Sequence, residues 1–314
     1  MKPRVAVVLK RSSWRKWVEE ERDARIMELI EADDETVRRM RPGHADHSET
    51  IDETRRALED LGAEATWFDR PHSFQVPAGE RCDLVVTVGG DGTLLAASHG
   101  IGSGVPLLGI NSAPSHSVGF FCAARKGGVR EALASALTGA LPRRELARMR
   151  VELNGRGLHD RVLNEALFCH ASPAATSRYI LRIVQPGAGG RVEEEEEQRS
   201  SGVWVGPPAG STAAQRSAGG RVLPLSSQKL QYVVREPYLR NGGLSLRMTL
   251  GLVEEDRALV MKSKMRQARV FLDGDHIMHE VTVGDVVTMR RSDEPLAVLG
   301  LTRNGERSAK RRGA

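Results

Sequence analysis

The chain has 314 residues and a formal net charge of +5; 40% of its residues are hydrophobic and 28% are charged. This length suits two domains, and this composition is typical of a globular protein, which excludes the fibrous and disordered classes. Aromatic residues make up only 4%, too few for extended base-stacking surfaces, and no apolar run reaches the ~20 residues of a membrane span. We therefore expect neither nucleic acid nor a membrane as a partner. The basic balance suits small anionic ligands such as nucleotides.

Cysteine usage and the N-terminal sequence indicate the compartment. Cys82, Cys122 and Cys169 are odd in number and lie far apart, and none belongs to a C-x-x-C pair, so we predict reduced, buried thiols. The sequence begins MKPRVAVVLK, which predicts a short strand and lacks the long apolar segment of a secretory signal. We expect a cytoplasmic protein.

The first half of the chain alternates between strand and helix patterns. Continuous apolar runs predict buried strands, and apolar residues at helical spacing predict helices. The predicted strands cover residues 5–9, 63–68, 82–88 and 105–111, and the predicted helices cover residues 47–61, 93–99 and 127–141. This alternation predicts a Rossmann-like, doubly wound α/β domain over residues 1–144.

The second half is rich in short strand patterns separated by Gly, Asn, Pro and Asp turns, such as RYILRIVQ, GVWVG and ARVFLDGD. These patterns predict an all-β domain, a β-sandwich, over residues 145–300, whose last strand can return to the first domain. We expect Glu193–Glu197 to be a solvated loop and the basic residues 301–314 to be a disordered tail. His44 and His47 have i,i+3 spacing, but two histidines without further ligands are weak evidence for zinc, and we predict no metal-ligating residues.

The sequence VVTVGGDGTLLAA, residues 85–97, places a glycine turn between a buried strand and a helix. Backbone N–H groups and the positive end of the helix dipole attract phosphate there, and Gly89, Gly90 and Gly92 allow close approach and positive φ. Phosphate repels Asp91, which becomes useful only by holding magnesium or by taking a proton from an attacking hydroxyl. As a turn residue or helix N-cap, Asp91 would instead be structural.

GGDGT after an apolar strand resembles the NAD kinase family and its superfamily of diacylglycerol, sphingosine and phosphofructo-type kinases. Further segments narrow the resemblance to the NAD kinases: GINSAPSHSVGFF, NEALF, SPAATSRYILRI, SSGVWVGPPAGSTAAQRSAGG and VFLDGD…VTVGDVV. The resemblance runs from about residue 5 to residue 299. The insertion before His47 and the lengthened NSAPSHSVG loop are more similar to the mitochondrial-type NAD kinases and their bacterial relatives.

The resemblance implies an enzyme that transfers the γ-phosphate of ATP, with Mg²⁺, to the 2′-hydroxyl of the adenosine ribose of NAD(H). It implies that Asp91 is the general base, and that Gly89, Gly90, Gly92 and Thr93 bind the phosphates of ATP. The residues implied to bind NAD are Asn111, Phe120, Asn164, Glu165, Arg178, Gly210, Ser211, Thr212 and Ala213. It further implies a homodimer or homotetramer, with the active site in the cleft between the two domains.

Each of these residues also has a structural interpretation. Asn164–Glu165 would be a β-turn, Asn111 a turn cap and Phe120 a core residue, while Arg178 and Arg199, candidates for pairing with phosphate, would be surface arginines. The chain departs from the family pattern at Ser201, Pro207, Ala209 and Ala214, where the family has Asp, Thr, Thr and an aromatic residue. Two other functions therefore stay open: a related kinase of a lipid or sugar, and a nucleotide-binding regulator without turnover. NAD or NADH as acceptor and ATP or polyphosphate as donor also stay open.

Overall fold

The computed structural model describes residues 1–76, 79–115, 117–187, 190–238 and 246–301. The predicted tail beyond Leu301 lies outside the described residues. The chain divides into two units: one consists of Met1–Arg144 and Leu296–Ala314, and the other of Glu145–Pro295. The last strand is thus part of the first unit, and the chain passes from one unit to the other twice.

The first unit is built on a seven-stranded sheet, which we call sheet A, with the strand order β2-β1-β3-β4-β19-β6 and β5 paired with β4. Its strands are β1 (Arg4–Leu9), β2 (Glu64–Phe68), β3 (Leu84–Gly89), β4 (Leu107–Asn111), β5 (Cys122–Arg125), β6 (Arg143–Leu146) and β19 (Leu296–Leu299). The strand pairs β1–β2, β1–β3, β3–β4 and β4–β19 are parallel. Every residue of β3 and β4 is buried, as expected for parallel strands that are covered on both faces.

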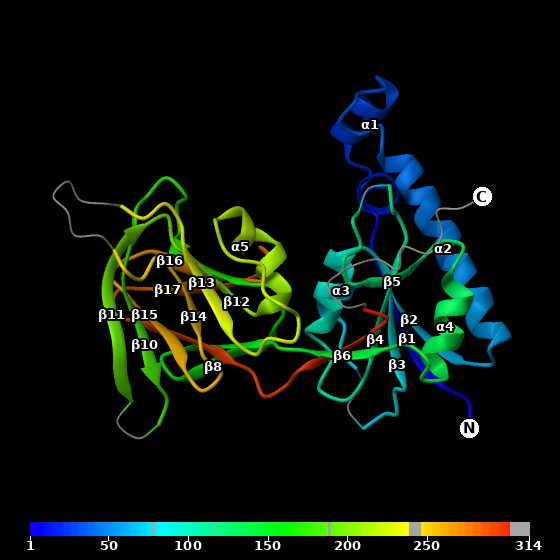
Figure 1. Ribbon diagram of the computed structural model, residues 1–314. Coiled ribbons are helices and arrows are strands. Elements are labelled where there is room, and N and C mark those ends of the chain that lie inside the picture. The colour runs from blue at the N-terminus through cyan, green and yellow to red at the C-terminus, as the bar shows by residue number, and fades with distance from the viewer. Residues whose placement is uncertain (77–78, 116, 188–189, 239–245, 302–314) are drawn as a thin grey trace. The chain divides into compact units, whose positions relative to one another are not determined.

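Helices cover both faces of sheet A. Its helical segments are the π-helix η1 (Arg15–Glu20), α1 (Ala24–Glu31), α2 (Met40–Asp60), the 3₁₀-helix η2 (Pro71–Ser73), α3 (Asp91–Ser98) and α4 (Val129–Leu137). Figure 1 shows α2 and α4 on one face of the sheet and α3 on the other. Leu58 of α2 and Leu133 of α4 pack with Val86 and Ile110 of the sheet in one apolar core. Helix α2 begins at Met40, earlier than the predicted start at residue 47.

The second unit contains two six-stranded sheets, which we call sheet B, in the order β11-β10-β15-β18-β7-β8, and sheet C, in the order β14-β13-β12-β9-β16-β17. The strands of sheet B are β7 (Met149–Leu153), β8 (Arg156–Val162), β10 (Ser177–Gln185), β11 (Arg191–Ser200), β15 (Ala258–Ser263) and β18 (Val286–Arg291). The strands of sheet C are β9 (Ala166–His170), β12 (Val203–Gly206), β13 (Leu230–Val234), β14 (Leu250–Val253), β16 (Ala268–Leu272) and β17 (Ile277–Val281). The 3₁₀-helix η3 (Pro208–Thr212) and α5 (Ala214–Ser217) follow β12.

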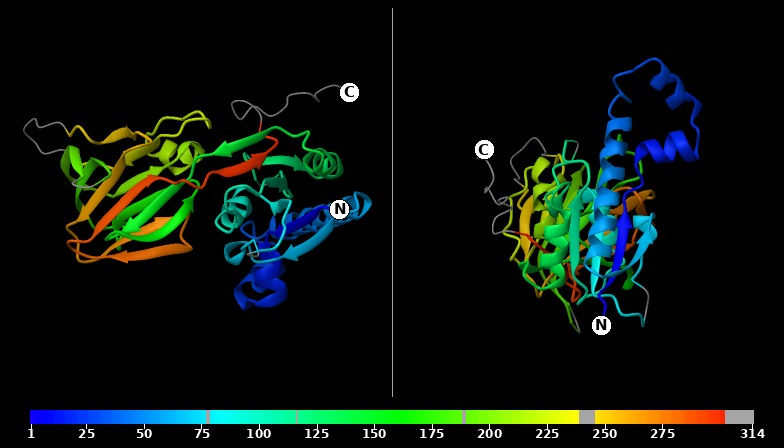
Figure 2. Two further views of the ribbon diagram at one scale, coloured as in Figure 1. Left: turned by 90° about the horizontal axis from the view of Figure 1, so that it is seen from below. Right: turned by 90° about the vertical axis from the view of Figure 1, so that its right-hand side faces the viewer.

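The two sheets of the second unit share one apolar core. Tyr179 and Leu181 of sheet B pack with Phe168 and Val205 of sheet C, all of them fully buried. Alternate residues of β10 are buried, so one face of each strand points into the core and the other points outward. The α/β unit and the β-sandwich predicted from the sequence are thereby confirmed (Figures 1 and 2).

The prediction that Glu193–Glu197 is a loop is wrong, because these residues lie in β11, which pairs with β10 along its whole length. Basic side chains from other segments offset the like charges: Glu193 pairs with Arg257, Glu195 with Arg182, and Glu197 with Lys264. A charged edge strand also resists pairing with other chains. The glutamate run is therefore a structural strand.

The described helices include none that is long and apolar enough to cross a membrane. Cys82, Cys122 and Cys169 are free thiols that are partly buried, less enclosed than the sequence suggested.

Candidate active site

The glycine turn between β3 and α3 is shaped by close packing. Strand β3 ends at Gly89, Gly90 caps α3, and Asp91 is the first residue of the helix. A Cβ atom at Gly89 would lie 2.2 Å from Thr93 Oγ1, and one at Gly90 would lie 2.5 Å from Ser117 Oγ. None of the three glycines of the turn has a positive φ, so that part of the prediction is wrong; crowding is what requires glycine at 89 and 90.

Gly92 differs from the other two glycines because no atom lies within 4 Å of where its Cβ would be. It is exposed in the first turn of α3. The first N–H groups of a helix have no acceptor within the helix. The backbone N–H groups of Asp91 and Gly92 can therefore bind an anion at this turn.

The Asp91 carboxylate holds the segment that follows β4. Its Oδ2 accepts the backbone N–H of Phe120 at 2.8 Å, and its Oδ1 accepts that of Phe121 at 2.9 Å. Asp91 is half-buried, and each oxygen keeps a lone pair for a second interaction. Asp91 is therefore not the N-cap of α3. Its two hydrogen bonds orient the carboxylate and so fix the directions from which it can accept a proton.

Asn111, at the end of β4, holds the same segment. Its Nδ2 donates to the Ser117 carbonyl at 2.9 Å, and its Oδ1 accepts the N–H of Ala113 at 3.2 Å. Gly119 has φ +63°, and a Cβ there would lie 2.4 Å from Asn111 Nδ2, so only glycine fits. The half-buried Phe120 ring packs edge-to-face on Phe121. The structure thus brings Asp91, Asn111 and Phe120 into one cluster.

His47 links the ends of β1 and β4 next to this cluster. Its Nε2 donates to the Lys10 carbonyl at 2.8 Å, so its Nδ1 accepts from the Ser112 hydroxyl at 2.9 Å. Burial lowers the pKa of His47 to about 4, and the ring is neutral at pH 7. His44 Nδ1 instead lies 2.8 Å from Ser12 Oγ, so the two histidines serve separate structural contacts.

In the second unit, Asp273 organises the Asn-Glu segment between β8 and β9. Its carboxylate accepts the backbone N–H groups of Leu163 and Asn164, both at 2.7 Å, and of Glu165 at 3.0 Å. The N–H of Asp273 in turn donates to the Glu165 carbonyl at 2.9 Å. In the sequence, Asp273 is only part of the FLDGD turn, and nothing in the local pattern predicts this positioning role.

Gly206 and Gly210 let the glycine-rich segment contact Asn164 directly. A Cβ at Gly206 would lie 2.2 Å from the Asn164 carbonyl oxygen, and one at Gly210 would lie 1.8 Å from it. The Gln215 amide donates to the same oxygen at 3.4 Å. The structure therefore places the predicted residue Asn164 against Gly210, and both Asn164 and Glu165 against Gly206.

The neighbouring residues of this segment differ in availability. The Ser211 hydroxyl is fully buried; it donates to the Pro208 carbonyl at 2.7 Å and accepts the N–H of Leu223 at 2.9 Å. Thr212 and Ala213 are half-buried. Ser211 thus shapes the segment from inside, while Thr212 and Ala213 retain accessible surface.

Two side-chain oxygens of the Asn-Glu pair are buried and lack a hydrogen-bond partner among the described residues: Asn164 Oδ1 and Glu165 Oε2. Burial, together with the charge of Asp273, raises the pKa of Glu165 to about 8. Leaving such atoms unpaired costs free energy. The two unpaired oxygens therefore mark a place where a ligand with hydroxyl or amide groups can complete the hydrogen bonds.

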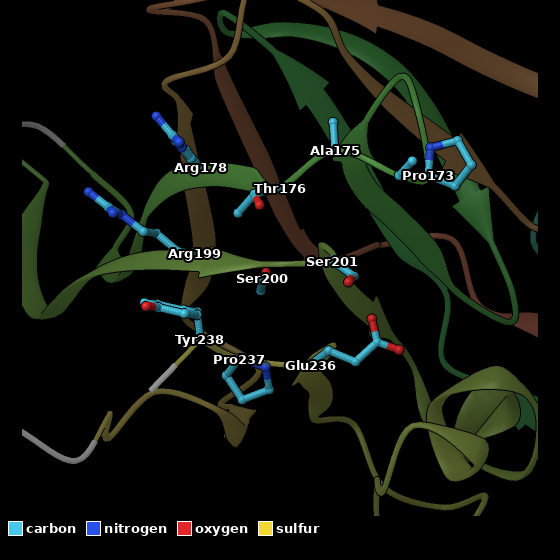
Figure 3. A pocket seen from close by; sticks show the side chains of 11 residues that line it. Pro173, Ala175, Thr176, Arg178, Arg199, Ser200, Ser201, Glu236, Pro237 and Tyr238 are labelled. Carbon is cyan, nitrogen blue, oxygen red and sulfur yellow. The ribbon is translucent and has the colours of Figure 1, made fainter. Parts of the chain in front are cut away.

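A separate cavity of about 520 Å³ lies beside β10 and β11. Its lining comprises Pro173, Ala174, Ala175, Thr176, Arg178, Arg199, Ser200, Ser201, Glu236, Pro237 and Tyr238 (Figure 3). The predicted candidate Arg178 and the departure at Ser201 thus share one cavity, and none of the residues from the Asn164–Gly210 contact lines it.

A further cavity of about 530 Å³ contains the departure at Ala214. Its lining comprises Trp204, Ala214, Ser217, Ala218, Arg235 and Glu236. The Arg235 guanidinium lies 5.8 Å from the centre of the Trp204 ring. Trp204 therefore supplies an aromatic surface to the cavity in which the family's aromatic residue at 214 is absent.

Comparison with known proteins gives a consistent set of relatives. Residues 15–140 match the family described as ATP-NAD kinase N-terminal domain. The chain is 35% identical over 273 residues to a probable NADH kinase of Oryza sativa subsp. japonica, covering 82% of each chain. It is 34% identical to an NADH kinase of Arabidopsis thaliana, covering 68% of this chain and 71% of the relative.

Solved structures share the fold. An NAD kinase from Archaeoglobus fulgidus in complex with ATP has a TM-score of 0.63 at 22% identity, covering 94% of this chain and 92% of that one. Yeast NADH kinase complexed with NADH has a TM-score of 0.64 at 15% identity, covering 97% of this chain and 85% of that one.

Proposed function

Since the chain belongs to the NAD kinase family, we propose that it transfers the γ-phosphate of ATP to the 2′-hydroxyl of the adenosine ribose of NAD(H), which yields NADP(H). The observation that carries this proposal is the pair of unpartnered buried oxygens on Asn164 and Glu165. They suit a ligand rich in hydroxyl groups, and the same chain holds a fixed carboxylate, Asp91, at a phosphate-binding turn.

In the proposed reaction, Asp91 takes the proton of the 2′-hydroxyl as the oxygen attacks the γ-phosphorus in line. The new O2′–P bond forms as the bond from the γ-phosphorus to the bridging oxygen breaks, and ADP leaves with that oxygen. The hydrogen bonds from Phe120 and Phe121 aim the carboxylate. The N–H groups at the start of α3 stabilise the charge on the phosphates, and Gly89, Gly90 and Thr93 shape that turn.

The acceptor assignments are made for each unit by itself. In the second unit, we assign Asn164 and Glu165 to the hydroxyl and adenine groups of NAD(H). In the first unit, we assign Asn111 and Phe120 to NAD(H). Gly210, Thr212 and Ala213 contribute backbone and accessible surface, and Ser211 acts by shaping the segment. Arg178 is assigned to a phosphate of NAD(H).

The donor set fits a magnesium ion that arrives with ATP. Among the described residues there is no group of three or more His, Cys, Asp or Glu side chains that could hold a metal. Mg²⁺ is commonly bound by one or two carboxylates and the substrate phosphates, and Asp91 supplies one carboxylate. When bound, the ion would neutralise charge on the phosphates of ATP.

We further propose that the enzyme is cytoplasmic, in keeping with its free cysteines. We also propose that it forms a homodimer or homotetramer. Light scattering on the purified protein measures the mass of the assembly, and a single-chain mass would contradict this part of the proposal.

The test is an assay of the purified chain with ATP or polyphosphate as donor, Mg²⁺, and NAD or NADH as acceptor. We expect NADP(H) formation by the wild type and a loss of at least about 10²-fold in kcat for Asp91→Asn. Asp83→Asn is the matched control, because the Asp83 carboxylate also accepts a backbone N–H, that of Arg4, but at the opposite end of β3. No NADP(H) from the wild type would overturn the function, and near-normal turnover by Asp91→Asn would remove Asp91 as the base.

A further inference from the structure

His47 is a buried side chain that the proposed reaction does not use. It belongs to α2 and is only 4% exposed. Its ring bridges two backbone segments of sheet A: Nε2 donates to the carbonyl of Lys10, which follows β1, and Nδ1 accepts from the hydroxyl of Ser112, which follows β4. Both nitrogens of the neutral ring are therefore engaged, one as donor and one as acceptor.

The two residues that His47 holds are the ones that hold the end of β3. Strand β3 lies between β1 and β4 in sheet A. The Lys10 N–H donates to the Val88 carbonyl, and the Ser112 N–H donates to the Gly89 carbonyl, both at 2.9 Å. These are the last two carbonyls of β3, and each is bound from a different neighbouring strand. One side chain thus connects the hydrogen bonds that fix β3 just before the glycine turn.

Close packing links this strand end to α3. A Cβ atom at Gly89 would lie 2.2 Å from Thr93 Oγ1 and 3.0 Å from the Cβ of Lys10, so the Gly89 backbone is confined by both side chains. In a packed interior such a segment cannot shift without moving its neighbours. Because Thr93 lies in the first turn of α3, a displaced strand end also displaces the N–H groups at the start of that helix.

We propose that His47 is a positioning residue for the phosphate donor: by holding Lys10 and Ser112, it aligns the glycine turn and the first N–H groups of α3 with the phosphates of ATP. This inference rests on the proposed function, which assigns those phosphates to this turn. An imidazole suits the role because its donor and acceptor stand at fixed positions on one rigid ring. Alignment matters because a displacement of about 1 Å, even one that originates far from the reacting atoms, is enough to weaken a site severely.

The test is calorimetric titration of the full chain with MgATP. His47→Leu fills a similar space without either hydrogen bond, and we expect it to raise the Kd of MgATP about tenfold. His47→Asn should recover part of this loss, because its amide oxygen reaches as far as Nδ1 and can accept from Ser112. Ser112→Ala removes that hydroxyl and keeps the N–H, so it should raise the Kd about threefold. Combined with His47→Leu it should add little, since both changes break the same contact.

Thr54→Val is the matched control. Thr54 lies on the same helix and is fully buried, and the substitution removes one hydrogen bond, from its hydroxyl to the Thr50 carbonyl at 2.7 Å. That bond lies within α2 and does not involve the end of β3. The Kd of MgATP should therefore stay within about twofold of the wild type. Equal losses of affinity in Thr54→Val and His47→Leu would overturn the proposal, because destabilisation alone would then account for them.

Hydrogen exchange tests the same contacts without nucleotide. The amides of Lys10 and Ser112 should exchange about tenfold faster in His47→Leu than in the wild type, and at the wild-type rate in Thr54→Val. Unchanged exchange at both amides would overturn the proposal, as would a wild-type Kd of MgATP in His47→Leu. If His47→Leu does not fold, a wild-type Kd in both Ser112→Ala and His47→Asn overturns it instead.

Neither measurement depends on turnover. A wild type that forms NADP(H) while His47→Leu keeps the wild-type Kd of MgATP contradicts this inference and leaves the proposed function intact. A wild type that forms no NADP(H), but whose affinity for MgATP falls in His47→Leu and not in Thr54→Val, contradicts the proposed function and supports the positioning role of His47.

Discussion

Glu165 makes the stability of the protein depend on pH in a direction opposite to that of most carboxylic acids. Its side chain is largely buried, its Oε2 has no partner among the described residues, and its pKa is raised from 4.5 to about 8. The folded protein therefore keeps a proton on Glu165 that the unfolded chain releases near pH 4.5. The stability this proton provides is complete below pH 4.5 and is lost as the pH rises towards 8.

The magnitude follows from the two pKa values. Each pH unit between them changes the free energy of unfolding by about 1.4 kcal/mol. At pH 7 the wild type has therefore lost about 3 kcal/mol relative to pH 4.5, and above pH 8 the loss reaches at most about 5 kcal/mol. Glu165→Gln keeps the shape of the side chain and cannot ionise, so this variant should lack that slope and gain stability over the wild type as the pH rises.

The assay is urea denaturation followed by circular dichroism at half-unit steps from pH 4.5 to pH 9, without ligand. The difference in unfolding free energy between Glu165→Gln and wild type should grow by about 3 kcal/mol from pH 4.5 to pH 7. Glu255→Gln, which changes an exposed carboxyl, should give a curve parallel to that of the wild type. A Glu165→Gln curve parallel to the wild type would refute the reasoning, because Glu165 would then be ionised in the folded protein.

Three further substitutions test other contacts. Gly210→Ala places a Cβ 1.8 Å from the Asn164 carbonyl oxygen. This substitution should destabilise the protein by about 1–3 kcal/mol and raise the KM for NAD about tenfold. An unchanged KM would show that Asn164 has not moved or does not touch NAD. The Cβ added by Gly92→Ala meets no atom within 4 Å, and alanine has the higher helix propensity, so the melting temperature should not fall. The KM for ATP should rise. An unaltered KM for ATP would place the phosphates elsewhere. His47, with its pKa lowered from 6.5 to about 4, stabilises the fold fully above pH 6.5. As the pH falls to 4 the wild type should lose about 3 kcal/mol, and His47→Gln should show a smaller slope in the same denaturation assay; equal slopes would mean that the ring is charged in the folded state.

Local patterns were sufficient for most of the secondary structure. Strands β3 and β4 are continuous apolar runs because parallel strands are covered on both faces, and such runs are visible in the sequence. The glutamate run failed as a prediction because two of its three basic partners are distant in the chain. Arg257, just before β15, lies 64 positions from Glu193, and Lys264, just after β15, lies 67 positions from Glu197. Together with Arg182 of β10, 13 positions from Glu195, they turn a repulsive sequence into a paired strand.

The sequence was sufficient to predict which residues belong to the candidate site, but not how their side chains are arranged. The motifs identified Asp91 and Glu165, but the hydrogen bonds that define their surroundings join residues 29 and 30 positions apart in one case and 108 positions apart in the other. Asp273 and Gln215 escaped notice for the same reason. The glycine turn was also only partly predictable. Glycine was expected there for its dihedral freedom, but the structure favours it at positions 89 and 90 for lack of space.

The position of β19 has a consequence for the order in which the molecule can be completed during synthesis. This strand lies between β4 and β6 in sheet A, yet it is separated from β6 in the chain by residues 147–295. The ribosome therefore releases the β-sandwich before it delivers the strand that joins β4 to β6. Until residue 299 emerges, β6 lacks its neighbour β19 in sheet A, and the edge of β4 that β5 covers at residues 109–111 stays open at Leu107. Unpaired strand edges of this kind are where nascent chains aggregate. Early folding of the sandwich, which keeps residues 144 and 296 within reach of each other, would shorten the search by which the last strand finds its place.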